Sequence, residues 1–359
     1  MSETVRTFAT PARTGLRACL VSACVVAASA GVAAQWRTLP RVLDACLAND
    51  VRLTPDERDR LAGGALVTTV LESEVSAEVA VFGAVWVNAP AEGYVAHVRD
   101  IQRFEPGSVF KQTRRFSASP DTDDVAELRL TREALDELRR CRVGRCGLKL
   151  PADAITQVQA RVDWSRATAA DEAQAWFREW VVRGVREYQA RGNDALAVYQ
   201  DGSRTTSVAE ELRSLVALLP PLTPQLGAIR SHLLEFPHTP LPQAENIYYW
   251  QEAQFGLKPT LRVHHLSIFQ QPGETVVVSK LLYATHYFWT DLEFTVLRED
   301  PARGPGFWLL TISRNRADGL SGLTGRFVRQ RARSEVLQRT AAVLRDTKAH
   351  LERDAASRR

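Results

Sequence analysis

The sequence predicts an α+β fold, in which an antiparallel sheet wraps around a long C-terminal helix and an all-α insertion interrupts the sheet domain. Three observations carry this prediction. The stretch "SAEVAVFGAVWVNAP" (76–90) is apolar on both faces of a strand, as buried strands are. Helical periodicity follows from about residue 131. From Leu261 onward the pattern turns to strands separated by turns, and the chain finishes in one long helix.

The segment 1–34 has the features of an export signal. Three arginines precede "ACLVSACVVAASAGVAA" (18–34), an apolar run of small residues, and "VAA" before Gln35 suits a cleavage site. Two alternatives stay open: an N-terminal membrane anchor, for which the run is short and weakly apolar, and lipoprotein processing at Cys24. We expect a periplasmic or secreted protein whose mature chain begins at Gln35.

The mature chain divides into three parts. Residues 35–130 form the N-terminal part of the sheet domain, with two short helices, a strand over 79–87 and a further short helix. Residues 131–256 form the helical insertion, including the segment "AENIYYWQEAQFG" at its end. Residues 257–359 return to an antiparallel meander and a helix over roughly 319–353.

The stretch "SKLLYATHYFWTDLEFTV" (279–296) belongs to a β run too long for one strand, so we expect a bend or hairpin inside it. Counting every second residue places one apolar set on a face toward a core or cavity: Leu282, Ala284, His286, Phe288, Leu292 and Phe294. The other face is aromatic and acidic, with Asp291 and Glu293 among its members. The ionisable residues exclude a membrane span, and we interpret the stretch as the wall of a core or cavity.

The cysteines predict one disulfide. "CRVGRC" closes a small loop, and in an oxidising compartment Cys141 and Cys146 are expected to be joined. Cys46 lies on the apolar side of a short predicted helix, which indicates a buried free thiol. The sequence shows no spacing typical of a metal site, and we expect no cofactor.

The order of these elements resembles the START-like (SRPBCC) superfamily, whose helix-grip fold wraps a curved sheet around a C-terminal helix. The resemblance lies in "VAVFGAVWVNAPAEGYVAHVRDIQRF" (79–104) and in the meander with its long helix. The chain also resembles an uncharacterised group of exported bacterial proteins with "CRxGxC" and "YxxHYF" elements. The resemblance implies a lipid-like or other apolar ligand held between sheet and helix. The helical insertion departs from the superfamily and could cover such a cavity.

We therefore expect an exported binding protein for an apolar or amphipathic small molecule. His286 is the best candidate for a polar group in the cavity, and the dense polar junction after the last strand would hold a polar end of the ligand. The expected site residues are Leu282, Ala284, His286, Phe288, Arg314, Asn315 and Arg316. His264 and His265 are neighbours on a strand and must face opposite sides of it, so they cannot easily share one metal.

Two other functions stay open. An enzyme of the same fold, a cyclase or hydrolase of lipid-like substrates with His286 as general base, would need a second titratable group within hydrogen-bond reach of that histidine. No nucleophile motif such as G-x-S-x-G supports it. The third possibility is a structural envelope protein whose side chains fill the space between sheet and helix.

The net charge of the chain bears on whether it binds nucleic acid or an anionic membrane. The net charge is +4, of which the leader's three arginines and one glutamate give +2, so the mature chain carries about +2 and is not expected to bind nucleic acid. The start of the long helix is locally basic, and a peripheral contact with an anionic membrane is a hypothesis for these residues: Arg326, Arg329, Arg331 and Arg333.

Overall fold

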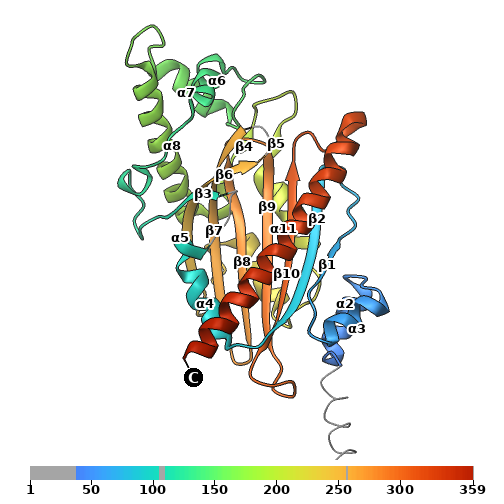
Figure 1. The fold of residues 1–359 in the computed structure, drawn as a ribbon. Coiled ribbons are helices and arrows are strands. Elements are labelled where there is room, and N and C mark those ends of the chain that lie inside the picture. Colours follow the sequence, from blue (N-terminus) through green and yellow to red (C-terminus); the bar gives the residue numbers. More distant parts are fainter. Residues whose placement is uncertain (1–37, 105–109, 256–257, 359) are drawn as a thin grey trace, which may run out of the picture.

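The computed structural model describes residues 38–104, 110–255 and 258–358 (Figure 1). The predicted signal peptide and its cleavage before Gln35 lie outside these residues. The fold class is confirmed as α+β, with one large antiparallel sheet and a long C-terminal helix, α11 (Gly322–Ser357). No helix in the described ranges is both long enough and apolar enough to cross a membrane.

The sheet has eight strands in the order β1-β2-β10-β9-β8-β7-β6-β3, and every neighbouring pair is antiparallel. Strands β6 to β10 form the predicted meander, and β2 returns beside β10, the last strand. The turns "QPGE" and "DPARGPG" connect β7 to β8 and β9 to β10, as predicted. The strand bounds are β1 (Val67–Val70), β2 (Glu78–Val87), β3 (Phe110–Arg115), β6 (Glu245–Phe255), β7 (Lys258–Gln271), β8 (Glu274–Ala284), β9 (Phe288–Glu299) and β10 (Phe307–Ala317).

The helical insertion lies between β3 and β6. Its long helix α8 (Ala169–Arg191) is followed by the predicted C-cap residue, Gly192, which has a positive φ. Around α8 lie four shorter helices: α6 (Arg132–Arg140), α7 (Ala152–Arg161), α9 (Val208–Ala217) and α10 (Leu226–Glu235). The small hairpin of β4 (Val198–Tyr199) and β5 (Thr206–Ser207) also belongs to it.

The two faces of the sheet have different covers. Alternate residues such as Phe294 and Leu310 pack in one core with Val185 and Leu212 of the insertion. The residues between them, such as Val85 and Leu309, pack with Leu344 of α11 and with the helix α4 (Ala91–Arg99). Figure 1 shows α11 crossing the front of the sheet diagonally toward α4. The insertion therefore covers the face opposite α11, instead of closing a cavity under α11.

Gly83 explains how closely α11 approaches the sheet. A Cβ at Gly83 in β2 would lie 2.6 Å from Cδ1 of Leu344 and 2.8 Å from Cγ2 of Thr340. The C-terminal half of the helix is also tied to the end of β2, because Lys348 Nζ donates to the carbonyl of Trp86 at 2.7 Å. Glu352 accepts the backbone N–H of Asn88 at 2.8 Å. These contacts hold α11 closely against β2.

Several boundaries differ from the predictions. "AENIYYWQEAQFG" was expected to be helical but contains β6, in which Ile247 and Tyr249 belong to one face and Tyr248 and Trp250 to the other. A strand has period two, so aromatic residues on both faces suit a strand that is covered on both sides. β3 escaped prediction because "FKQTRR" is a polar edge strand without apolar alternation. The N-terminal helices are α2 (Arg41–Asn49) and α3 (Pro55–Ala62), as expected, and α3 begins with a capping box from Thr54.

Candidate functional site

The run 279–296 contains the expected hairpin. β8 ends at Ala284 and β9 begins at Phe288, and the turn between them carries Tyr287 at φ 63°. A β-bulge precedes the turn, because Val263 is paired with Tyr283 whereas His264 is paired with Leu281. The bulge shifts the alternation by one residue, so counting every second residue does not hold across it.

The predicted wall therefore divides between the two faces. Leu282 belongs to the core shared with the insertion. Ala284 is paired with Arg262 and so lies on the α11 face, although its backbone N–H donates to the Tyr199 hydroxyl of the insertion. Phe288 also lies toward α11, where it packs beside Val79 and Val81. The expectation of one continuous wall was wrong, because it ignored the bulge.

The polar junction after the last strand is likewise divided. Arg314 and Arg316 lie on the insertion face, where both contact Glu78, at 2.5 and 2.9 Å. Arg316 also reaches Glu211 of α9 at 2.7 Å. These two arginines are thus engaged by carboxylates on the insertion side and do not face the α11 side, contrary to the expectation. Asn315 alone of the three lies on the α11 face, opposite Asp291 of β9.

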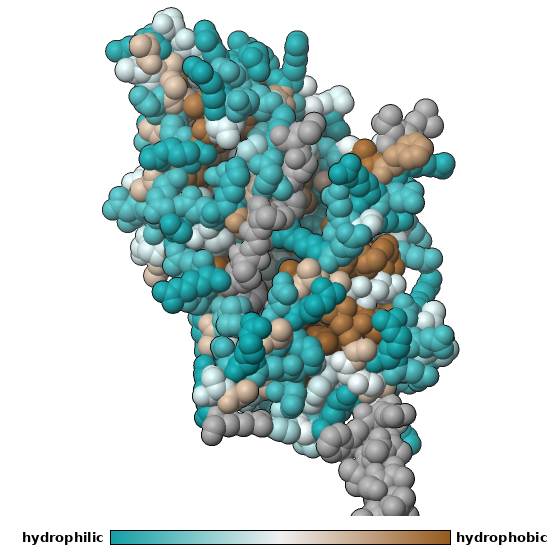
Figure 2. All heavy atoms as spheres, in the orientation of Figure 1, coloured by the Kyte–Doolittle hydropathy of each residue, from teal (hydrophilic) through white to brown (hydrophobic). Residues whose placement is uncertain are grey.

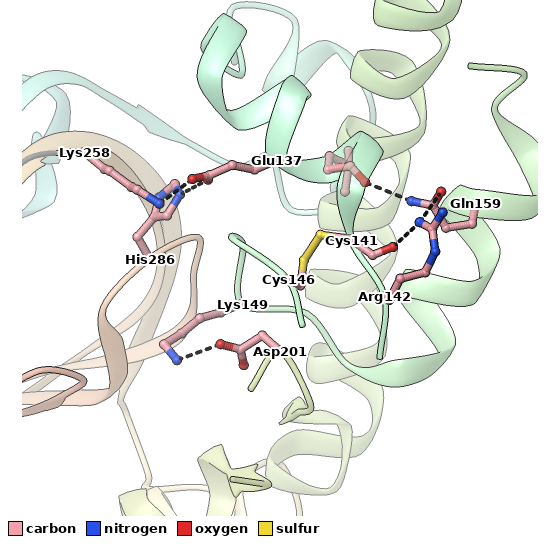
Figure 3. The surroundings of a disulfide bond; sticks show 10 residues. Glu137, Cys141, Arg142, Cys146, Lys149, Gln159, Asp201, Lys258 and His286 are labelled. Atoms are coloured by element: carbon pink, nitrogen blue, oxygen red, sulfur yellow. Dashed lines mark hydrogen bonds and ion pairs between the residues drawn. A yellow bond between two sulfur atoms is a disulfide. The ribbon is translucent and has the colours of Figure 1, made fainter. Parts of the chain in front are cut away.

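His286 is part of a link between the sheet and helix α6 (Figure 3). Its Nε2 lies 3.3 Å from Oε2 of Glu137, whose other oxygen lies 2.5 Å from Nζ of Lys258. Burial lowers the pKa of His286 despite the hydrogen bond with Glu137. Burial alone would raise the pKa of Glu137, but the hydrogen bonds from Lys258 and His286 outweigh it and hold that pKa below its ordinary value.

The link has the second titratable group that the enzyme hypothesis required, but little space beside it. The adjoining cavity, lined by His286, Thr285, Leu261 and Trp250 among others, measures about 20 Å³. That volume holds about one water molecule. A lipid-like substrate does not fit there, so the arrangement suits fastening of the insertion better than catalysis.

The predicted disulfide is present between Cys141 and Cys146, close to this link (Figure 3). The loop that it closes is anchored to the β4–β5 hairpin, since the N–H of Gly144 donates to the carbonyl of Gln200 at 2.7 Å. Cys46 is free and buried, as expected, and burial raises the pKa of its thiol to about 12. An unionised buried thiol is a poor nucleophile.

The α11 face of the sheet has an opening at its middle. Glu293 lies in the centre of β9, an interior strand, yet its side chain is exposed to solvent. Ser313, directly opposite Glu293 on β10, is half-buried. Interior strands of a covered sheet are normally closed to water. Solvent therefore reaches the middle of this face beside α11, which the sequence pattern had assigned to an outer or insertion-facing surface.

A buried polar relay lies next to Glu293. Ser279 of β8 is paired with Glu293, and its hydroxyl lies 3.2 Å from Nδ1 of His264 on β7. The Tyr249 hydroxyl lies 3.1 Å from the same Ser279 oxygen, and the Tyr249 ring stacks on His264 at 4.9 Å with 7° between the planes. His264 is buried, with 3% of the residue exposed, yet its Nε2 has no hydrogen-bond partner among the described residues.

Other ionisable groups surround this relay. Burial, followed by the nearby charge of Arg262, lowers the pKa of His264 well below its ordinary value, so the imidazole is neutral. Arg262 is itself paired with Asp291 at 2.6 Å. Burial raises the pKa of Asp291 in spite of that ion pair. Burial and the charge of Glu293 both raise the pKa of Tyr94, which reaches over from α4.

The adjacent histidines face opposite sides, as predicted. Nδ1 of His265 lies 2.9 Å from the Tyr188 hydroxyl of α8, on the insertion face. Lys280 lies in the same interface with 0% exposure, and its Nζ donates to Oδ1 of Asn193 and to the carbonyl of Leu233. Burial lowers the pKa of Lys280 to about 7. No group of three or more potential metal ligands occurs within the described part of the chain.

A larger depression lies at the β3 edge of the sheet. It has a volume of about 610 Å³ and lies between the segment after β3, α8 and the start of β6. Its lining is mixed in character: Arg115, Phe116, Ser117, Ala118, Asp124, Gln189, Asn246, Ile247 and Tyr248. None of the predicted site residues borders it.

The basic start of α11 does not form one outward face. Arg329 donates to the carbonyl of Ser76 at 2.9 Å, and Arg333 is half-buried, whereas Arg331 points outward and pairs with Glu335 at 2.7 Å. Beside them Phe327 and Val328 are 79% and 50% exposed. Brown apolar surface is visible at this end of the helix in Figure 2.

Comparison with known proteins assigns no family. A scan against protein-family models finds no match to the chain, and a search of curated proteins finds no similar sequence.

Proposed function

We propose that the protein binds a small amphipathic molecule between the sheet and α11. The observation that carries the proposal is the exposure of Glu293 in the centre of the sheet. Polar groups surround Glu293, and the half-buried side chains of Phe288, Val336 and Leu337 belong to an apolar cluster on the same face of the sheet. A molecule with one polar and one apolar part matches such a lining.

The strand order supports a helix-grip fold of the START-like kind as part of this proposal. β2 lies beside β10, β3 lies at the far edge, and the chain ends in a helix across the sheet. The ligand would occupy the sheet–helix side, and the insertion would support the sheet from behind. The proposed site residues accordingly change to Glu293, His264, Ser279 and Tyr249, and Phe288 and Asn315 stay among them.

Filling the opening tests the proposal. Ser313→Phe would place an aromatic ring beside Glu293, whereas Ser119→Phe adds the same ring to an exposed position in the segment after β3. The two variants and the wild type would be purified from an exporting host and compared by native and denaturing mass spectrometry. We expect a bound mass of a few hundred daltons in the wild type and in Ser119→Phe, and its loss in Ser313→Phe. Equal occupancy in all three would contradict the proposal.

The Ser279–His264 pair raises the alternative of acyl-transfer chemistry, but its geometry favours binding. A catalytic histidine is oriented by a third group at its second nitrogen, and Nε2 of His264 meets no carboxylate among the described residues. Its low pKa also makes it a weak general base. A fluorophosphonate probe that labelled Ser279 would favour the enzyme instead.

A peripheral membrane contact is a further proposal for the start of α11. The exposed Phe327 and Val328 favour it, with Arg326 and Arg331 as exposed charges beside them. Phe327→Ser should reduce co-sedimentation with phosphatidylglycerol-containing vesicles, whereas an unchanged bound fraction would remove the proposal.

A further inference from the structure

The depression at the β3 edge of the sheet has binding groups of its own. Its volume of about 610 Å³ lies within the range of small-molecule sites. Phe116 and Tyr248 in its lining belong to the core that the sheet shares with the insertion. This part of the depression therefore lies on the insertion face, whereas the site proposed above lies on the α11 face.

A buried hydrogen-bond network fixes the side-chain amide of Asn246 in this lining. Its Oδ1 lies 2.8 Å from Nε2 of His265 and accepts a hydrogen bond from the Ser267 hydroxyl at 2.9 Å. Burial lowers the pKa of His265 well below its ordinary value, so the imidazole is neutral and has one N–H. Because the Tyr188 hydroxyl donates to Nδ1 of this ring at 2.9 Å, Nε2 carries the proton. Two donors thus hold the amide oxygen.

The nitrogen of the same amide is free. Nδ2 of Asn246 has no hydrogen-bond partner among the described residues, and it is not enclosed, since the residue is half-buried and borders the depression. Gln189 of α8 and Tyr248 also line the depression, and their side-chain polar groups have no hydrogen-bond partner within the described part of the chain. Three neutral polar side chains are thus available to a ligand.

The charged side chains of the lining balance each other. Among the described residues it contains one basic and one acidic side chain, Arg115 and Asp124. Oδ2 of Asp124 accepts hydrogen bonds from the Ser117 hydroxyl and from the backbone N–H of Asp121, both at 2.9 Å. With one charge of each sign, the lining exerts no net attraction on an anion or on a cation.

Aromatic surface completes the lining, because Phe116 and Tyr248 both border the depression. A sugar ring matches such a lining: its C–H faces pack on aromatic rings, and its hydroxyl groups both donate and accept hydrogen bonds. We propose that the depression binds a neutral saccharide unit, in which one sugar oxygen accepts a hydrogen bond from Nδ2 of Asn246. Gln189 and Tyr248 exchange hydrogen bonds with its other hydroxyl groups. An alkyl chain would leave these polar groups unpaired.

Methyl glycosides of glucose, galactose, mannose and N-acetylglucosamine are the probes that test this proposal. Methyl glucuronide and glucosamine are charged relatives, and cyclohexanol has a six-membered ring with a single hydroxyl. Binding to the protein purified from an exporting host would be measured by saturation-transfer NMR. We expect a Kd of about 1 mM for at least one neutral glycoside, and about tenfold weaker binding of the charged sugars and of cyclohexanol.

Asn246→Asp tests the donor. It keeps an oxygen for His265 and Ser267 and replaces the free NH₂ group, so glycoside affinity should fall about tenfold. Asn49→Asp makes the same change at an exposed position at the end of α2 and should bind as the wild type does. If Asn246→Asp does not fold, Gln189→Ala serves in its place, because it removes a half-buried side chain without a hydrogen-bond partner among the described residues and should also weaken binding.

Each outcome supports or overturns the proposal. A wild type that binds none of the four neutral glycosides, or binds the glucuronide or cyclohexanol equally well, would overturn it. Unchanged glycoside binding by both Asn246→Asp and Gln189→Ala would overturn the assignment of the site. Ser313→Phe should bind the glycosides as the wild type does, so this saccharide site and the site between the sheet and α11 can fail independently.

Discussion

The buried amine of Lys280 makes a quantitative prediction about stability and pH. Its side chain is fully buried between β8 and the insertion, and Tyr188 and Phe236 lie against the amine, with Nζ 5.0 and 5.6 Å from the ring centres. No carboxylate contacts it among the described residues, and burial lowers the pKa from 10.5 to about 7. Between these two values the unfolded chain holds a proton that the folded protein has released. Stability must therefore rise with pH across this range.

The magnitude follows from the two pKa values of this lysine. Well between the two values each pH unit contributes about 1.4 kcal/mol. At pH 7 the folded amine is still half protonated, so the slope is smaller there, and the gain between pH 7 and pH 9 comes to about 2 kcal/mol. Lys280→Met keeps the approximate length of the side chain and removes the titrating group. The variant loses two hydrogen bonds, to Asn193 and Leu233, but that loss is independent of pH.

The assay is urea-induced unfolding of wild type and Lys280→Met at pH 7, 8 and 9. Lys111→Met is the control, because it removes a half-exposed amine and the same formal charge. We expect the wild type to gain about 2 kcal/mol relative to Lys280→Met between pH 7 and pH 9. Parallel pH profiles for the two proteins would show that the amine keeps its proton when folded. The argument from burial would then be wrong.

Three further variants test contacts that hold the fold together. Glu78→Gln should cost about 3 kcal/mol in the free energy of unfolding, because Arg314 loses its buried ionic partner; a change below about 1 kcal/mol, measured by urea unfolding, would show that the pair is solvated. Gly83→Ala should lower stability by about 1–3 kcal/mol, because the new methyl group collides with Leu344, and thermal unfolding with an unchanged midpoint would contradict that contact. Cys141→Ser should cost about 2 kcal/mol for so short a loop, and equal stability of oxidised and reduced wild type would argue against a structural role.

The sequence predicted the parts of the fold that local patterns control. The meander, its turns, the long final helix and the disulfide follow from alternation, turn residues and cysteine spacing. The ion pair of Glu78 with Arg314 could not be predicted in this way, because its partners come from opposite ends of the sheet domain, on β2 and β10. β3 was missed for a related reason, since an edge strand is defined by its pairing with β6 and not by its own polar sequence.

The faces of the residues in 279–296 were assigned wrongly, because a bulge shifts the alternation by one residue. An extra residue in a strand exchanges its two faces beyond that point, so the bulge at Leu282 divided the expected wall between the insertion face and the α11 face. Asp291 and Glu293, assigned to the outer or insertion-facing surface, came to lie under α11. The apolar side chains then pack against the insertion, whereas the side facing α11 is polar at its middle. This polar face opposite a filled core is what the proposed binding between the sheet and α11 rests on.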